Sequence, residues 1–117
     1  MDIAIDIHLV LPEELPVDAL ELSIVFANAL ENAIQAVKEL PDDQRHIICK
    51  SVKYLHFIME IANPYAGEIV FDRRGIPTTN RPEHGIGTRS VVAFAEKYNA
   101  LYLFRAEGGW FKVRVAV

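Results

Sequence analysis

Apolar and polar positions in the first forty residues predict a strand followed by a helix. Residues 3–11 are rich in β-branched and apolar side chains, which is typical of a strand. Asp18 and Glu21, three residues apart, form a capping box that opens the helix, and Pro41 closes it. Apolar residues then recur at spacings of three and four, which indicates one buried helix face: Leu22, Phe26, Leu30, Ala33 and Val37.

The middle of the chain is predicted to form a hairpin and then a long loop. Residues 45–62 are dense in Ile, Val, Tyr and Phe and are long enough for two strands. Residues 63–87 contain three Pro and four Gly around a polar centre. Loops of this length are uncommon in small domains and are usually functional. We therefore expect chemistry in or beside this loop.

A second helix and a closing hairpin complete the chain. Residues 88–98 are predicted to be helical, with Asn99 as a left-handed cap. Residues 101–104 and 110–117 alternate around Gly108-Gly109 and predict two antiparallel strands. The order strand, helix, two strands, loop, helix, two strands favours an α+β fold, with helices on one face of a mixed, largely antiparallel sheet. We expect a single domain over residues 1–117, because no repeat or linker interrupts them.

Composition excludes several classes of function. The chain has 117 residues, of which 51% are hydrophobic and 24% charged, as in globular domains. A net charge of −4 and the lack of a basic run argue against nucleic-acid binding. No continuous apolar run is long enough to predict direct membrane insertion of this fragment. The single Cys49 cannot form an internal disulfide, which suits a reducing cytoplasm, and a small buried hydrophobe is its simplest role.

Asn28, Asn32 and Gln35 lie four and three residues apart and so share one side of the first predicted helix. This line lies opposite Phe26, Leu30 and Val37, and one interpretation is a solvated helix face. The other is a ligand groove, because Asn is unfavourable inside a helix and the neighbouring positions are apolar or small. Two amide oxygens one turn apart can complete the coordination of a phosphate-bound Mg²⁺. The spacing alone leaves both interpretations open.

Two further segments carry candidate chemistry. His84-Gly85-Ile86-Gly87-Thr88 precedes the second helix, where glycines permit close approach and helix amides attract phosphate. It is neither a P-loop nor a dinucleotide fingerprint. Asn63-Pro64-Tyr65-Ala66-Gly67 ends an apolar strand and, taken alone, is ordinary turn chemistry.

In this order the three segments resemble the GHKL ATPase superfamily, which includes gyrase, mismatch-repair ATPases, a heat-shock chaperone and histidine kinases. Residues 30–36 are similar to its N box, residues 63–67 to its first glycine box, and residues 84–87 to its second. Gly109-Trp110-Phe111-Lys112-Val113 resembles its terminal strand, so the likeness covers nearly the whole chain. The variant most similar is that of peptide-sensing, quorum-sensing receptor kinases, in which the box aspartate is commonly Asn and the lid is similar to Gly75-Ile76-Pro77-Thr78-Thr79.

The resemblance implies a two-layer α/β sandwich of the Bergerat type, with ATP and Mg²⁺ as ligands. It places Mg²⁺ on Asn32 with Asn28, which are also the implied catalytic residues. Asn63 would receive the adenine amino group, with Ile61 and Ile86 against the ring, and Arg73, Arg74 and Arg81 are candidates for lid contacts with phosphate. The full set of expected nucleotide contacts is Asn28, Asn32, Gln35, Asn63, Gly67, Thr79, His84, Gly85, Ile86 and Gly87.

Two departures from the family pattern refine this expectation. ATP-hydrolysing members carry Glu as general base four residues before the magnesium Asn, whereas this chain has Asn28, which cannot accept a proton near pH 7. Transfer of the γ-phosphate to another group therefore fits better than hydrolysis. Asn63 replaces an aspartate, and because its amide can either accept from adenine or donate to guanine, we expect weaker base selectivity.

The function expected from the resemblance is the ATP-binding catalytic domain of a two-component sensor histidine kinase. Its partners would be ATP or ADP, a separate dimerisation domain that carries the phosphoacceptor histidine, and a response regulator. The domain would be cytoplasmic and its parent protein membrane-anchored. Two alternatives stay open: a standalone GHKL module that acts as an anti-sigma-type protein kinase, and a non-catalytic nucleotide-binding regulator.

Overall fold

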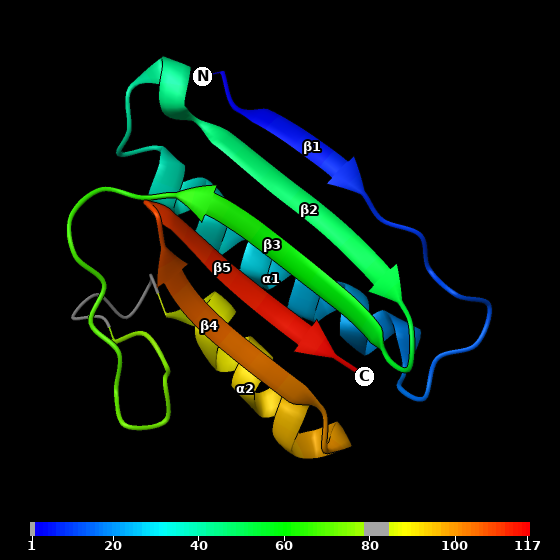
Figure 1. Cartoon of the computed structure of the whole chain (residues 1–117). Coiled ribbons are helices and arrows are strands. Elements are labelled where there is room, and N and C mark those ends of the chain that lie inside the picture. The colour runs from blue at the N-terminus through cyan, green and yellow to red at the C-terminus, as the bar shows by residue number, and fades with distance from the viewer. Residues whose placement is uncertain (1, 79–84) are drawn as a thin grey trace.

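Five strands form one sheet, and two helices cover one of its faces (Figure 1). The computed structural model describes residues 2–78 and 85–117. The strand order is β1-β2-β3-β5-β4; β1 runs parallel to β2, and the other neighbouring pairs are antiparallel. The fold is therefore α+β with a mixed, largely antiparallel sheet, as predicted.

The elements follow one another in the predicted order. Their bounds are β1 Ala4–His8, α1 Ala19–Val37, the short 3-10 helix η1 Asp42–Gln44, β2 His46–Lys53, β3 Phe57–Pro64, α2 Ile86–Tyr98, β4 Leu101–Glu107 and β5 Trp110–Ala116. Within the described residues, neither helix combines the length and apolar character that a membrane span requires.

Helix α1 begins where the capping box predicts. The Asp18 carboxylate accepts a hydrogen bond from the backbone N–H of Glu21 at 2.9 Å. The buried face of α1 is rotated from the predicted one, because Val25 and Ala29 are buried whereas Phe26 and Leu30 are only partly covered. The line of Asn28, Asn32 and Gln35 therefore lies beside the buried face of α1, not opposite to it.

The second half of the chain differs from the prediction mainly at element ends. Helix α2 starts at Ile86, two residues earlier than expected, with Gly85 as its N-cap. Asn99 has the predicted left-handed conformation, with φ of 53°. Gly108 and Gly109 both have positive φ, which a two-residue hairpin turn with the proper twist requires. That turn allows β4 to run to Glu107, three residues beyond the predicted strand end.

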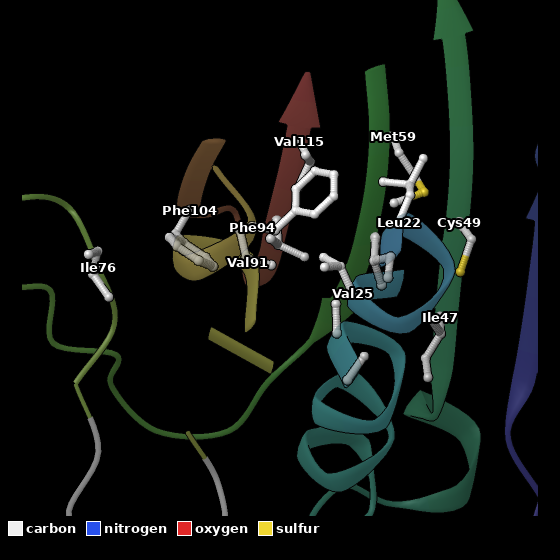
Figure 2. Close-up of a cluster of buried hydrophobic side chains, with 14 of the residues drawn as sticks. Leu22, Val25, Ile47, Cys49, Met59, Ile76, Val91, Phe94, Phe104 and Val115 are labelled. Carbon is white, nitrogen blue, oxygen red and sulfur yellow. The ribbon is translucent and has the colours of Figure 1, made fainter. Parts of the chain in front are cut away.

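The core lies between the helices and the sheet face that they cover. Figure 2 shows Leu22 and Val25 of α1 with Ile47, Cys49 and Met59 of β2 and β3, and Val91 and Phe94 of α2 near Phe104 and Val115. Cys49 is fully buried, and burial raises the pKa of its thiol, so it behaves as the small core hydrophobe that the sequence suggests. Ile76 anchors part of the long loop in this cluster.

The other face of the sheet carries a row of charged side chains across three strands. Glu60 of β3 pairs in register with Lys50 of β2 and with Arg114 of β5. The Arg114 guanidinium donates two hydrogen bonds to Glu60, at 2.6 and 3.0 Å, and the Lys50 ammonium lies 3.6 Å from the carboxylate. Glu60 is only 4% exposed although α1 and α2 both lie on the opposite face of the sheet. Its ion pairs therefore link the three central strands.

Candidate functional site

The site lies at the end of the molecule where β3 finishes, the second half of α1 passes, and α2 begins (Figure 1). A cavity of about 170 Å³ opens there, between these elements and the described part of the long loop. Its walls are Asn32, Ala36, Asn63, Tyr65, Glu68, Ile69, Pro77, Thr78, Thr88 and Phe111. A mostly apolar hollow with a few polar groups is the usual form of a small-molecule site.

A second hollow of about 180 Å³ adjoins the first along α1. It shares Asn32, Ala36, Tyr65 and Ile69 with the first and adds Gln35, Glu39 and Ala66. Asn32 and Gln35 are both half-buried in this shared groove. The groove explains why the polar line of α1 sits among small residues, and it favours the ligand interpretation over a simple solvated face.

Asn28 lies where α1 and α2 meet. Its Nδ2 donates a hydrogen bond to the Ser90 hydroxyl at 3.1 Å, which leaves Oδ1 as the atom that can accept or coordinate. Gln35 is arranged similarly, since its Nε2 donates to Glu31 at 3.0 Å. Both amides therefore keep their oxygens for a ligand.

Gly87 permits a close approach of the two helices. A methyl group at this position would lie 2.7 Å from the backbone oxygen of Asn28 and 2.8 Å from Cβ of Asn32, closer than any real contact. The lack of a side chain at Gly87 therefore allows the start of α2 to pack directly against Asn28 and Asn32. Ile86 is 51% exposed and lines none of the cavities at this end, and Ile61 is buried in a smaller hollow beneath them.

Asn63 occupies the end of β3, opposite Phe111 of β5. Its side chain is nearly enclosed, and Nδ2 donates to the carbonyl oxygen of Pro64 at 2.9 Å. Gly67 follows in a turn with φ of 80°, and nothing lies within 4 Å of a Cβ built on it. This backbone conformation accounts for the glycine without any ligand.

Three predicted residues, Thr79, Arg81 and His84, lie outside the described residues. Arg73 and Arg74 are described and exposed, on a turn that the Asp72 carboxylate closes by accepting from the backbone N–H groups of Arg74 and Ile76. The Arg74 guanidinium lies 3.8 Å from Asp72. In this arrangement neither arginine lines the cavity.

Several cavity residues were not among the expected nucleotide contacts. Thr88 directly follows Gly85-Ile86-Gly87. It lies in the first turn of α2, where its side chain lines the cavity. Phe111 could have been found from its position opposite Asn63, but that requires the register of β3 on β5. Tyr65, Glu68 and Pro77 come from the loop, where sequence periodicity gives no orientation.

Comparison with known families decides what kind of groove this is. A family model described as the GHKL domain matches residues 17–117. The chain belongs to the GHKL family. A search among curated proteins found no match. GHKL domains bind ATP, typically with Mg²⁺, so the groove along α1 belongs to an ATP-binding module.

The side chains present in this GHKL groove fit both ligands. Asn32 and Asn28 bring amide oxygens to the groove and to the α1–α2 contact, and Mg²⁺ on a nucleotide needs only one or two protein oxygens beside phosphate and water. The N-terminus of α2, capped by Gly85, supplies free backbone N–H groups of the kind that bind phosphate.

Proposed function

We propose that this GHKL domain is the ATP-binding catalytic domain of a two-component sensor histidine kinase. It would donate the γ-phosphate of ATP to a histidine on a separate dimerisation domain, from which a response regulator takes it. The parent protein would be membrane-anchored, with this domain in the cytoplasm. The observation that carries the proposal is the amide at position 28, which stands where hydrolysing relatives have a carboxylate.

An amide at this position supports transfer to a side chain rather than to water. A general base must accept a proton, and the Asn28 amide cannot do so near pH 7. Its Nδ2 is also engaged by Ser90, so the oxygen is the atom left to bind a ligand at the contact between α1 and α2. That oxygen can position a metal-bound phosphate but cannot activate a water molecule. Phosphoryl transfer needs chiefly positioning and charge stabilisation, which such a site supplies.

The residues divide along the groove by role. Asn63 would lie at the base end, where the cavity walls are mostly apolar. Asn32 and Asn28 would hold Mg²⁺, and with it the phosphates, near the start of α2. The backbone amides of Gly85, Ile86 and Gly87, ahead of Thr88 at the start of α2, would stabilise negative charge on the phosphates.

The test incubates the full-length protein that carries this domain with γ-labelled ATP and Mg²⁺. We expect label that is lost in acid and kept in alkali, on a histidine outside residues 1–117. The isolated domain should stay unlabelled and hydrolyse ATP very slowly. Serine or threonine phosphate on a partner would contradict the proposal, and so would phosphate on one of the four histidines of this chain.

A further inference from the structure

Thr88 places in the site a hydroxyl that pairs with no residue the structure describes. Its side chain is only 8% exposed and lines both the main cavity and the smaller hollow beneath it. No hydrogen bond joins this hydroxyl to any described residue, yet the described residues include no sealed side-chain oxygen or nitrogen without a partner. The hydroxyl oxygen therefore keeps some accessible surface, and the hollows that the Thr88 side chain lines are where a ligand can reach it. A polar group kept this buried is costly unless a ligand or water satisfies it.

The second such oxygen belongs to Asn63, which lines the same two hollows. Because Nδ2 donates to the Pro64 carbonyl at 2.9 Å, the amide has a fixed orientation. Turning it over would place Oδ1 against the Pro64 carbonyl oxygen and lose that hydrogen bond. Oδ1 accepts no hydrogen bond from the described side chains and, like the Thr88 hydroxyl, is not sealed off. The cavity thus contains one fixed acceptor and one hydroxyl.

We propose that Thr88 is a base-contacting specificity residue, which acts with an Asn63 side chain held in its acceptor orientation by Pro64. This inference rests on the proposed binding of ATP. The Asn63 oxygen accepts from the 6-amino group of adenine, and the Thr88 hydroxyl donates to a ring nitrogen beside that group. Guanine has a carbonyl oxygen at position 6, which would face the Asn63 oxygen and be repelled.

This arrangement changes what the sequence led us to expect of Asn63. A freely rotating amide would relax the choice between adenine and guanine, whereas the hydrogen bond to Pro64 opposes that rotation. Selectivity for adenine is therefore kept without the charge of an aspartate. Thr88 adds a contact from α2 that the glycine-box pattern does not predict.

The test compares nucleotide binding by the wild type, Thr88→Val and Thr88→Ser, using calorimetry with Mg²⁺. Valine has the shape of threonine without the hydroxyl, so Thr88→Val should weaken ATP binding by about three- to tenfold. Thr88→Ser should bind ATP nearly as the wild type does. Because the hydroxyl pairs with no described residue, the nucleotide-free thermal midpoint of Thr88→Val should not fall.

Two analogues locate the contact on the base. In 1-deaza-ATP and 7-deaza-ATP, one ring nitrogen is replaced by carbon. For the analogue that lacks the contacted nitrogen, Thr88→Val should cause no further loss, whereas the other analogue should lose affinity as ATP does. GTP should bind the wild type about tenfold more weakly than ATP.

Each failure has a distinct meaning. If the wild type binds no adenine nucleotide, the proposed function is wrong and this inference fails with it. If the wild type binds ATP but Thr88→Val binds it equally well, only the role of Thr88 is wrong. Equal losses for ATP and both analogues, or a large fall in the thermal midpoint, would make Thr88 a structural residue. Equal wild-type affinities for ATP and GTP would contradict the fixed Asn63 orientation.

Discussion

At the scale of single residues, the site depends on amides whose nitrogen atoms are already engaged. Asn28 donates to Ser90, Gln35 to Glu31, and Asn63 to Pro64. In each case the protein holds the donor and leaves the oxygen for a ligand. Carboxylates would also present oxygens, but they would lose these structural hydrogen bonds and add charge.

Asn63→Asp tests this idea, because a carboxylate cannot donate to the Pro64 carbonyl. At neutral pH we expect the free energy of unfolding to fall by about 1–3 kcal/mol, since an ionised oxygen would be buried against that carbonyl. Burial should raise the folded-state pKa of the new carboxyl above its unfolded value of about 3.9. The stability deficit should therefore shrink as pH falls through the folded-state pKa, where a protonated carboxyl can donate again.

Chemical denaturation of Asn63→Asp and wild type between pH 3 and pH 8 provides the measurement. Asn99→Asp, at the exposed left-handed cap of α2, serves as a control that should lack this pH-dependent recovery. Equal stability of Asn63→Asp and wild type at pH 7 would show that the hydrogen bond to Pro64 does not constrain the site.

At the scale of elements, the contact between α1 and the start of α2 positions the groove. It is close because Gly87 has no side chain to separate the helices. The second glycine of the box is thus explained by helix packing, quite apart from any contact with phosphate.

Gly87→Ala should push the first turn of α2 away from α1. Alanine favours a helix by up to about 1 kcal/mol over glycine, but overpacking typically costs about 1–3 kcal/mol. The obstructing atom is backbone, which cannot turn aside, so we expect a net loss of stability and weaker ATP binding. Thermal unfolding measures the stability, and calorimetry measures the ATP affinity.

Ala93→Ser is the control, because it adds one atom to an exposed position of the same helix and should change neither the stability nor the ATP affinity. If Gly87→Ala keeps wild-type stability and ATP affinity, the packing argument is contradicted.

The sequence predicted the elements well because their signals are local. The Asp18–Glu21 cap, the Asn99 cap and the Gly108-Gly109 turn each depend on neighbouring residues and were confirmed. The predicted buried face of α1 was right at Leu22, Ala33 and Val37 but wrong at Phe26 and Leu30, since the buried side depends on where α2 packs. Asn32 and Asn63 do line one cavity. The places of Thr88 and Phe111 follow from the helix start and from strand register respectively, which one sequence does not specify.

At the scale of the whole molecule, the two faces of the sheet are held in different ways. One face packs apolar side chains beneath the helices, and the other centres on Glu60 and its partners on neighbouring strands. Burial alone would raise the pKa of the Glu60 carboxyl, but the hydrogen bonds and charge of Arg114, then the charges of Lys50 and Lys112, hold it below its ordinary value of 4.5.

Glu60→Gln should destabilise the fold in a pH-dependent way. A carboxyl whose folded-state pKa is lowered stabilises the protein above its unfolded pKa, and this contribution is lost as pH falls through the folded-state pKa. We expect a deficit of about 1–3 kcal/mol at pH 7, because Glu60 makes charge-assisted hydrogen bonds. The deficit should diminish below the ordinary carboxyl pKa of 4.5.

Urea unfolding across this pH range measures the difference. Glu107→Gln is the control, since Glu107 pairs with Arg105 at 3.4 Å with both side chains exposed, and such pairs contribute little. A Glu60→Gln deficit that stays constant from pH 7 to pH 3 would show that Glu60 acts through packing and not through its charge.

The central claim is that this GHKL groove binds ATP through a magnesium ion held by Asn32. Calorimetric titration of the domain with ATP and ADP, with and without Mg²⁺, tests it most directly, and Asn32→Ala is the matched variant. We predict weak binding of both nucleotides that strengthens with Mg²⁺ in the wild type. In Asn32→Ala the magnesium dependence should disappear while the fold stays intact. No binding at saturating nucleotide, or wild-type affinity unaffected by Mg²⁺, would contradict the account.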